Sequence, residues 1–414
     1  MPSSTNPHSL LLLPCPPTSL SLDSLRAAYG PALKVAFHTL KSSSTNHKNS
    51  VLEILLPCPQ IVEKLRLPRS VIFSDVSSLL AGFYSLSSII AAEQGIATDG
   101  PTKVDVRVIL LSYEKDKIYE KNVLPTRLGR TKTGPIIDLP TFASSRRNWQ
   151  YIFHLDGEEG VAVYIAYIEL AARVSPAVKG EKRIITGGIS MLSQETSVNE
   201  SAEGLAQEHS VVAVGGTFDH LHAGHKLLLT ATALLLQPKF RYDDPSRRLI
   251  IGVTGDQLLV NKKHAEYMQS WKERQDDVVD FLLTILSFPH LHNVEDIVES
   301  HVNEPVVNGK GTHTLIKHAD LIIECVEIQD PFGPTITDES ITALVVSGET
   351  RSGGAAVNDK RKEKNWPLLE VFEVDVLNAQ TDDPTATSTE AFASKISSSA
   401  IRERRAQMAK QSVL

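Results

Sequence analysis

The segment at residues 211–226 constrains the fold of this chain more than any other part of it. An apolar run, 211–214, leads into Gly215 and Gly216, and a His-x-Gly-His motif places His222 and His225 just before an apolar, helix-forming stretch. This order predicts a strand, a tight turn and a helix. The glycines let the backbone approach a ligand closely, and the helix start directs free N–H groups and a positive dipole end at it. The segment therefore predicts a phosphate site in which both imidazoles can hydrogen-bond an anion.

The rest of the chain predicts two α/β domains. The length of 414 residues allows two domains with a substantial core each. Residues 193–210 are polar and lack apolar periodicity, so we interpret them as a linker between a domain at 1–192 and a domain at 211–414. The second domain alternates strand and helix signals, which favours a parallel sheet covered by helices.

Individual elements follow from the same patterns. In the second domain we expect strands at 211–214, 249–254, 320–328, 344–347 and 371–377, helices at 224–236 and 270–287, and loops at 303–318 and 379–392. In the first we expect strands at 10–13, 51–56 and 104–111 and a helix at 22–29, while 161–172 fits either type. The first domain shows no catalytic, phosphate or metal motif, so we assign it only a structural, regulatory or docking role.

Composition excludes several classes of function. A net charge of −7 argues against general nucleic-acid binding, which requires a basic surface. The three cysteines form no Cys-x-x-Cys pair, which argues against a disulfide framework or a zinc site, and we expect no protein-held metal. No apolar run approaches the length of a membrane span, and the run at 10–13 is too short and proline-rich for a signal peptide. We therefore expect a cytoplasmic protein.

Four later segments can return to the phosphate turn. They are Gly-Val-Thr-Gly-Asp at 252–256 with a basic loop at 262–263, Gln-Asp-Pro-Phe-Gly-Pro at 329–334, the Gly-rich stretch 345–361, and Lys-Ile-Ser-Ser-Ser-Ala-Ile-Arg at 395–402. A lysine beside a phosphate turn stabilises charge on phosphoryl oxygens. Serines at a helix start cap the helix and present N–H groups to an anion.

Together these motifs closely resemble the phosphopantetheine adenylyltransferase family of eukaryotic and archaeal type, within the HxGH nucleotidyltransferase superfamily. The resemblance covers about Val211 to Arg405 and leaves residues 1–200 outside it. It implies a Rossmann-like nucleotidyltransferase domain preceded by an extra α/β domain. It also implies transfer of adenylyl from ATP to 4′-phosphopantetheine, giving dephospho-CoA and pyrophosphate, with Mg²⁺ entering on the nucleotide. No Walker-type GxxxxGK[ST] motif occurs in this sequence, so we do not expect it to carry the kinase that is fused to this enzyme in some organisms.

The resemblance also implies roles for individual residues. The expected catalytic residues are His222, His225 and Lys262. The expected ATP contacts are Gly215, Gly216, Thr217, Phe218, His225, Ser397, Ser398, Ser399 and Arg402. The expected acceptor contacts are Thr217, Lys262, Asn358 and Arg361, with Lys262 preferred over Lys263 and Arg361 over Arg351. Asp219 fits a structural role, in which it orients the turn.

Two kinds of alternative remain. One is a related adenylyl- or cytidylyltransferase with another phosphorylated acceptor, although the Arg-Thr-x-Gly-Ile-Ser-Thr segment typical of cytidylyltransferases is absent. The other is a non-catalytic scaffold that holds other coenzyme A enzymes through residues 1–200. Intact histidines, Lys262 and the serine cluster favour catalysis, and scaffolding in addition to catalysis stays open.

Overall fold

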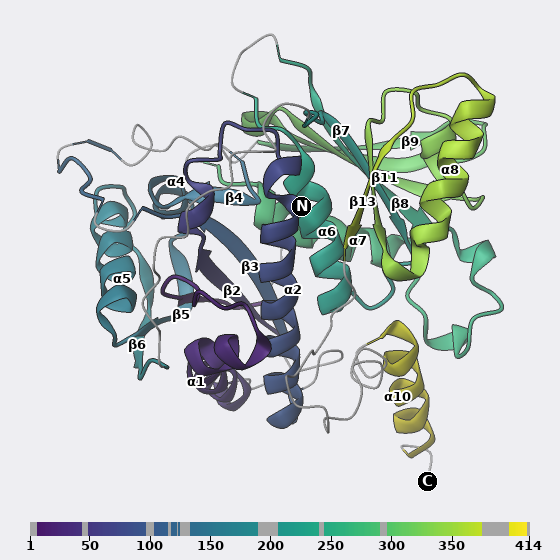
Figure 1. The fold of residues 1–414 in the computed structure, drawn as a ribbon. Coiled ribbons are helices and arrows are strands. Elements are labelled where there is room, and N and C mark those ends of the chain that lie inside the picture. Colours follow the sequence, from purple (N-terminus) through teal and green to yellow (C-terminus); the bar gives the residue numbers. More distant parts are fainter. Residues whose placement is uncertain are drawn as a thin grey trace.

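Two sheets, one from each half of the chain, form this α/β molecule (Figure 1). The structure is a computed structural model, and it describes residues 6–43, 49–96, 103–114, 117–121, 123–124, 133–188, 206–239, 244–289, 296–374 and 397–411. The expected loop at 379–392 and residues 193–205 of the expected linker lie outside these ranges. The first sheet uses strands before residue 186 and the second uses strands after residue 210.

All strands of the first sheet are parallel, in the order β4-β3-β2-β1-β5-β6. Its strands are β1 (His8–Leu12), β2 (Ser50–Pro57), β3 (Val104–Ser112), β4 (Ile136–Asp138), β5 (Asn148–Leu155) and β6 (Lys179–Ile185). Its helices are α1 (Leu22–Ser43), α2 (Ser70–Glu93), α4 (Leu139–Ser145) and α5 (Glu158–Ala171), with a short 3₁₀ turn η1 (Pro59–Ile61). Every residue of β2 is buried, as expected for a parallel strand with both faces covered.

The sequence-based expectations for this half hold in part. The three expected strands and the helix at 22–29 are confirmed, and the ambiguous segment 161–172 belongs to helix α5. The sequence did not predict α2, β5 or β6. Strand β6 is an edge strand in which all positions but the last are exposed and carry mostly charged side chains, so it has no apolar pattern to detect.

The second sheet has the order β13-β12-β7-β8-β11-β10-β9. Its strands are β7 (Val211–Gly216), β8 (Arg247–Thr254), β9 (Ile297–Asn303), β10 (Lys310–Ile316), β11 (Leu321–Ile328), β12 (Ala343–Ser347) and β13 (Glu370–Val374). Its helices are α6 (Ala223–Leu235), α7 (Trp271–Leu286), α8 (Arg351–Glu363) and α10 (Ser398–Gln411). The 3₁₀ turns are η2 (Asp256–Leu258), η3 (Ala265–Tyr267), η4 (Lys317–Ala319), η5 (Gly333–Ile336) and η6 (Gly348–Thr350).

One expectation for this half is wrong. The segment 303–318 is not a loop throughout, because it contains β10, which pairs antiparallel with both β9 and β11. The inward-facing positions of β10 are Thr312, Thr314 and Ile316. Buried threonines give the strand no hydrophobic alternation, so its period of two was not visible in the sequence. The sheet is therefore mixed: β13, β12, β7, β8 and β11 pair in parallel, and β10 runs antiparallel to both of its neighbours.

Helix α2 joins the two halves. It packs against α1 on one side and α6 on the other (Figure 1). It is long and apolar enough to span a membrane, contrary to our expectation, but 67% of its most apolar window is buried inside the molecule. Buried apolar side chains of both sheets form one connected cluster, with a smaller cluster on the second sheet. The two halves thus share a core where we expected two separate cores.

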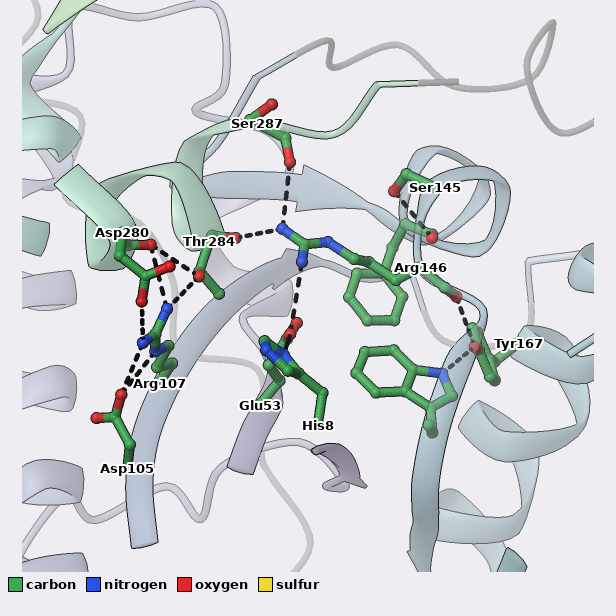
Figure 2. A network of polar contacts seen from close by, with 12 residues as sticks. His8, Glu53, Asp105, Arg107, Ser145, Arg146, Tyr167, Asp280, Thr284 and Ser287 are labelled. Atoms are coloured by element: carbon green, nitrogen blue, oxygen red, sulfur yellow. Dashed lines mark hydrogen bonds and ion pairs between the residues drawn. The ribbon is translucent and has the colours of Figure 1, made fainter. Parts of the chain in front are cut away.

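Charged side chains also cross between the halves (Figure 2). Arg146 lies just after α4 and donates to the α7 carbonyls of Thr284 at 2.8 Å and Ser287 at 3.2 Å. The same guanidinium lies 3.4 Å from Glu53 of β2, whose other partner is His8 at 2.6 Å. Burial raises the pKa of the Glu53 carboxyl, but Arg146 and His8 more than offset this and hold the pKa below its ordinary value.

We predict that Arg146→Met lowers the free energy of unfolding by about 3 kcal/mol, because it leaves the buried Glu53 carboxylate without its arginine. Urea unfolding followed by circular dichroism measures this change. Arg183→Met removes a guanidinium from an exposed pair with Glu181 and should change stability by less than about 0.5 kcal/mol. Equal losses in the two variants would contradict the importance of this buried contact.

Candidate active site

The turn at residues 217–222 follows β7, a central strand that ends in Gly215 and Gly216, at the carboxyl edge of the parallel part of the second sheet. Ligands of open α/β sheets bind at this edge. The turn is tightly packed: a Cβ on Gly216 would lie 3.0 Å from the Phe218 ring. Phe218 and His220 both adopt positive φ, 52° and 48°. The segment thus changes direction sharply before α6 begins.

Phe218 differs from its expected role. It has no exposed surface, and its ring packs 5.4 Å from the ring of His225. A residue without exposed surface cannot contact a nucleotide in this conformation. We therefore correct the expected ATP contact and assign Phe218 a structural role, in which its ring packs against the ring of His225.

The two motif histidines lie face to face at the start of α6. His222 is the N-cap residue and its side chain makes no capping hydrogen bond. The His222 and His225 rings stack with centroids 3.8 Å apart. Burial, the Lys226 charge and His220 lower the pKa of His222 to about 4, and burial with His222 and His220 lowers that of His225 well below its usual range. Both rings are therefore neutral at pH 7.

A neutral pair suits an anion site in one particular way. Nδ1 of each ring is buried and has no hydrogen-bond partner. A neutral imidazole carries one N–H. With that proton on Nε2, each ring can donate to an anion without bringing in a full charge.

Two buried arginines, Arg274 and Arg402, hold the turn in place, and the sequence predicted this role for neither of them. Arg274 of α7 is fully buried and donates to the Thr217 carbonyl at 2.7 Å, to the Gln269 carbonyl at 3.1 Å and to Asp256 at 2.6 Å. It thereby ties the turn to the end of β8. The sequence offered no signal for Arg274, since a single arginine in an amphipathic helix normally lies on its exposed face.

Helix α10 brings the C-terminal serines to the turn. Arg402 forms an ion pair with the fully buried Asp219 at 2.6 Å, donates to the Lys263 carbonyl at 3.0 Å and lies 3.2 Å from the Ser399 hydroxyl. The Ser398 hydroxyl donates to the Asp219 carbonyl at 2.7 Å. The structure therefore brings the serine cluster and the HxGH turn together, as expected. Asp219 has the expected structural role.

The remaining expected residues are distributed as follows. Gly215 and Gly216 are the last two residues of β7 and pair with β8, whereas we expected them in the turn, and Thr217 is the first residue after the strand. Ser397 accepts from the Ala400 amide at 3.3 Å, so the serines cap α10. Lys262 and Lys263 are both exposed on the loop between η2 and η3, and the structure does not distinguish between them as ligand contacts.

Asn358 and Arg361 do not have the expected role in acceptor binding. Asn358 of α8 exchanges two hydrogen bonds with the backbone of Leu369, at 3.0 and 2.8 Å. Arg361 has no exposed surface. Its guanidinium donates to the carbonyls of Pro367, Thr335, Asp338, Glu339 and Ile341, at 2.8 to 3.2 Å. Both side chains fasten the segments around α8, and we correct their expected substrate contacts to a structural role.

Metal ligands do not gather in the described residues, where no three His, Cys, Asp or Glu side chains lie together as a candidate site. The described part of the chain has a small pocket of about 40 Å³ at the start of α6, with His222 in its lining. This pocket lies between α6 and the first half of the chain rather than on the carboxyl edge.

The neutral histidines predict a pH dependence of stability. The unfolded chain protonates these side chains near pH 6.5, whereas folded His222 does so only near pH 4. Between these values the unfolded state binds more protons, so the free energy of unfolding falls as pH falls from about 6.5 to about 4.

Urea unfolding at a series of pH values measures that slope. The His222→Asn, His225→Asn double variant should flatten it, whereas His301→Asn on exposed β9 should leave it unchanged. A slope that persists in the double variant would show that other groups cause it.

Arg361→Met should lower the free energy of unfolding by about 3 kcal/mol, because five carbonyls, two of them in buried hydrogen bonds, lose their donor. Lys360→Met, at the neighbouring position whose side chain is 45% exposed, should change stability by less than about 0.5 kcal/mol. Denaturant unfolding checks both values. An Arg361→Met protein of normal stability would restore Arg361 as a candidate ligand contact.

Comparison with known proteins supplies two kinds of match. Residues 1–191 match a family described as a domain of unknown function (DUF8446). An uncharacterized protein of Schizosaccharomyces pombe is 34% identical over 199 residues, which are 48% of this chain and 49% of that protein. The phosphopantetheine adenylyltransferase of Saccharomyces cerevisiae is 34% identical over 197 residues, again 48% of this chain and 49% of that protein.

The archaeal relatives are matched over most of their length. The phosphopantetheine adenylyltransferase of Thermococcus kodakarensis is 27% identical over 184 residues, 44% of this chain and 86% of that protein. A crystal structure of a protein with unknown function from Archaeoglobus fulgidus covers 40% of this chain and 97% of its own, at 24% identity and a TM-score of 0.26. The chain thus spans about half the length of the fungal relatives it matches, and several of its curated relatives are named phosphopantetheine adenylyltransferase.

Proposed function

We propose that this protein transfers the adenylyl group of ATP to 4′-phosphopantetheine and releases pyrophosphate. The observation that carries this proposal is the meeting of the HxGH turn and the serine-capped start of α10 at one carboxyl sheet edge. Relatives named phosphopantetheine adenylyltransferase support the choice of reaction.

The reaction requires little acid–base chemistry from the protein. The acceptor phosphate is already an anion, so it attacks the α-phosphorus in line without a general base, and the bond to the pyrophosphate oxygen breaks. Catalysis is then positioning together with stabilisation of negative charge. A turn held by Arg274 and Asp219 is suited to this task, because its N–H and imidazole groups stay fixed while charge develops.

Each group at the edge has a proposed part. His222 and His225 donate from Nε2 to ATP phosphate oxygens, with His225 facing the transition state. Thr217 and Lys262 hold the acceptor phosphate beside the α-phosphate, and Gly215 and Gly216 line the nucleotide. The exposed position of Lys262 allows it to reach a ligand at the sheet edge.

Helix α10 provides the proposed site for the β- and γ-phosphates. It is 14 residues long, and its first turn presents backbone N–H groups with Ser397, Ser398 and Ser399 around them. Arg402 holds this helix on Asp219, and contact of its guanidinium with ATP stays a prediction. Mg²⁺ enters on the triphosphate oxygens, which fits its preference for substrate phosphates over dedicated protein cages.

Pyrophosphate release with Mg-ATP tests the proposal. Release should require 4′-phosphopantetheine and should fall at least about a hundredfold in His222→Ala and His225→Ala, because each removes a donor to the developing charge. Lys262→Ala should fall similarly and Lys272→Ala, on the exposed face of α7, should not.

The alternatives appear as different outcomes of the same assay. Release with CTP or with another phosphorylated acceptor, but not with ATP and 4′-phosphopantetheine, would replace the substrates and keep the chemistry. No release from folded wild-type protein with any of these pairs would contradict an enzyme and leave the scaffold interpretation.

A further inference from the structure

The lysine that follows the HxGH motif points away from the proposed ATP site. Lys226 lies in the first turn of α6 and is only 6% exposed. Its ammonium donates to the carboxylate of Asp105 and to the carbonyl of Val106 at 2.9 Å. Both partners belong to β3, in the half of the chain that matches a family of unknown function. The lysine that follows the motif is therefore bound by residues from the other half of the molecule.

Asp105 is itself held in place by a buried charge network (Figure 2). Arg107, two residues along β3, donates to Asp105 at 2.7 Å and to Asp280 of α7 at 2.5 Å. The network thus contains two cations and two carboxylates and links β3, α6 and α7. Burial raises the pKa of Asp105, but Lys226 and Arg107 more than offset it and hold that pKa below its ordinary range.

A lysine at this position of a helix is unfavourable without a partner. The N-terminal end of a helix carries a partial positive charge, which favours anions and opposes cations. The first turn of α6 contains no acidic residue of its own. Asp105 therefore supplies, from another sheet, the negative charge that this turn lacks.

Lys226 also lies beside the catalytic candidates. The small pocket at the start of α6 has Ser88, Asp105, His222 and Lys226 in its lining. An ammonium released from Asp105 has room to move into this pocket, toward the His222 ring. The Asp105 contact therefore fixes both the first turn of α6 and the distance of a positive charge from His222.

We infer that residues 1–191 complete the active site, with Asp105 as a positioning residue that holds Lys226 and, through it, the HxGH turn. This inference rests on the proposed adenylyl transfer for its effect on rate. It gives the first half of the chain a role in catalysis in addition to any role in docking. Asp105 touches neither substrate nor reacting atoms.

Asp105→Asn tests the inference, because it removes the charge and nearly preserves the shape. We expect kcat to fall on the order of tenfold or more with little change in KM, since a displaced turn misaligns the reacting groups. Adding Lys226→Met to Asp105→Asn should recover part of the lost kcat, because it removes the buried ammonium group that no longer has a carboxylate partner. Asp276→Asn, an identical change in an exposed pair on α7, should keep the wild-type rate.

The pH profile separates positioning from ordinary structural support. In Asp105→Asn, Lys226 faces Arg107 and Lys103 beside β3, His222 on α6 and Tyr84 on α2, with Asp280 as the remaining carboxylate of the network. The unpaired ammonium should lose its proton more easily. The activity of this variant relative to wild type should therefore rise between pH 7 and pH 9.

The NMR signal of the His222 ring gives a measurement that does not depend on the identity of the acceptor substrate. Lys226→Met should raise the pKa of His222, because the ammonium charge lowers it. A wild-type rate and a wild-type His222 titration in Asp105→Asn and Lys226→Met would overturn the inference. An Asp105→Asn, Lys226→Met double variant would also overturn it if its loss of kcat were the full combination of the two single-variant losses, with no recovery. A wild-type protein without adenylyl transfer would contradict the proposed function alone, since the His222 titration would still decide this inference.

Discussion

Buried guanidinium groups that donate to backbone carbonyls hold the candidate site together. Arg274 reaches the Thr217 carbonyl from α7, and Arg402 reaches Asp219 and the Lys263 carbonyl from α10. Two residues of the turn, Phe218 and His220, adopt positive φ, a conformation that persists only where the surrounding structure holds it. The planar, five-donor guanidinium can bind several loop atoms at once. The geometry of the phosphate turn therefore depends on helices that lie later in the chain.

The sequence predicted those parts of the fold and site that local patterns encode. The strand, turn and helix around residues 211–235 form in the expected order, and the helix expected at 270–287 is α7, which begins with a capping box between Ser270 and Glu273. The serine cluster of α10 does meet the turn, which a motif resemblance implied. Strand β10 was missed because threonines occupy its buried face, and β6 because its exposed face is charged.

Roles of single polar residues were harder to predict, since burial depends on the tertiary structure. Arg361 was expected to contact a substrate and Phe218 a nucleotide, yet neither has exposed surface. Arginine in a motif suggests a phosphate contact, whereas here its donors bind carbonyls of the surrounding loops. Asp105 gave no signal at all, because its partner Lys226 lies in a distant segment and in the other half of the chain.

Helix α2 has a consequence for the order in which the chain folds. Its apolar surface is covered partly by α1, which precedes it, and partly by α6, which follows it after the whole first sheet. During synthesis the first half emerges before α6 exists, and domains generally begin to fold as they emerge. A nascent first half therefore presents a long apolar helix face to its surroundings until α6 emerges to cover it. The helix that carries the histidine motif thus also covers apolar surface of the first half of the chain.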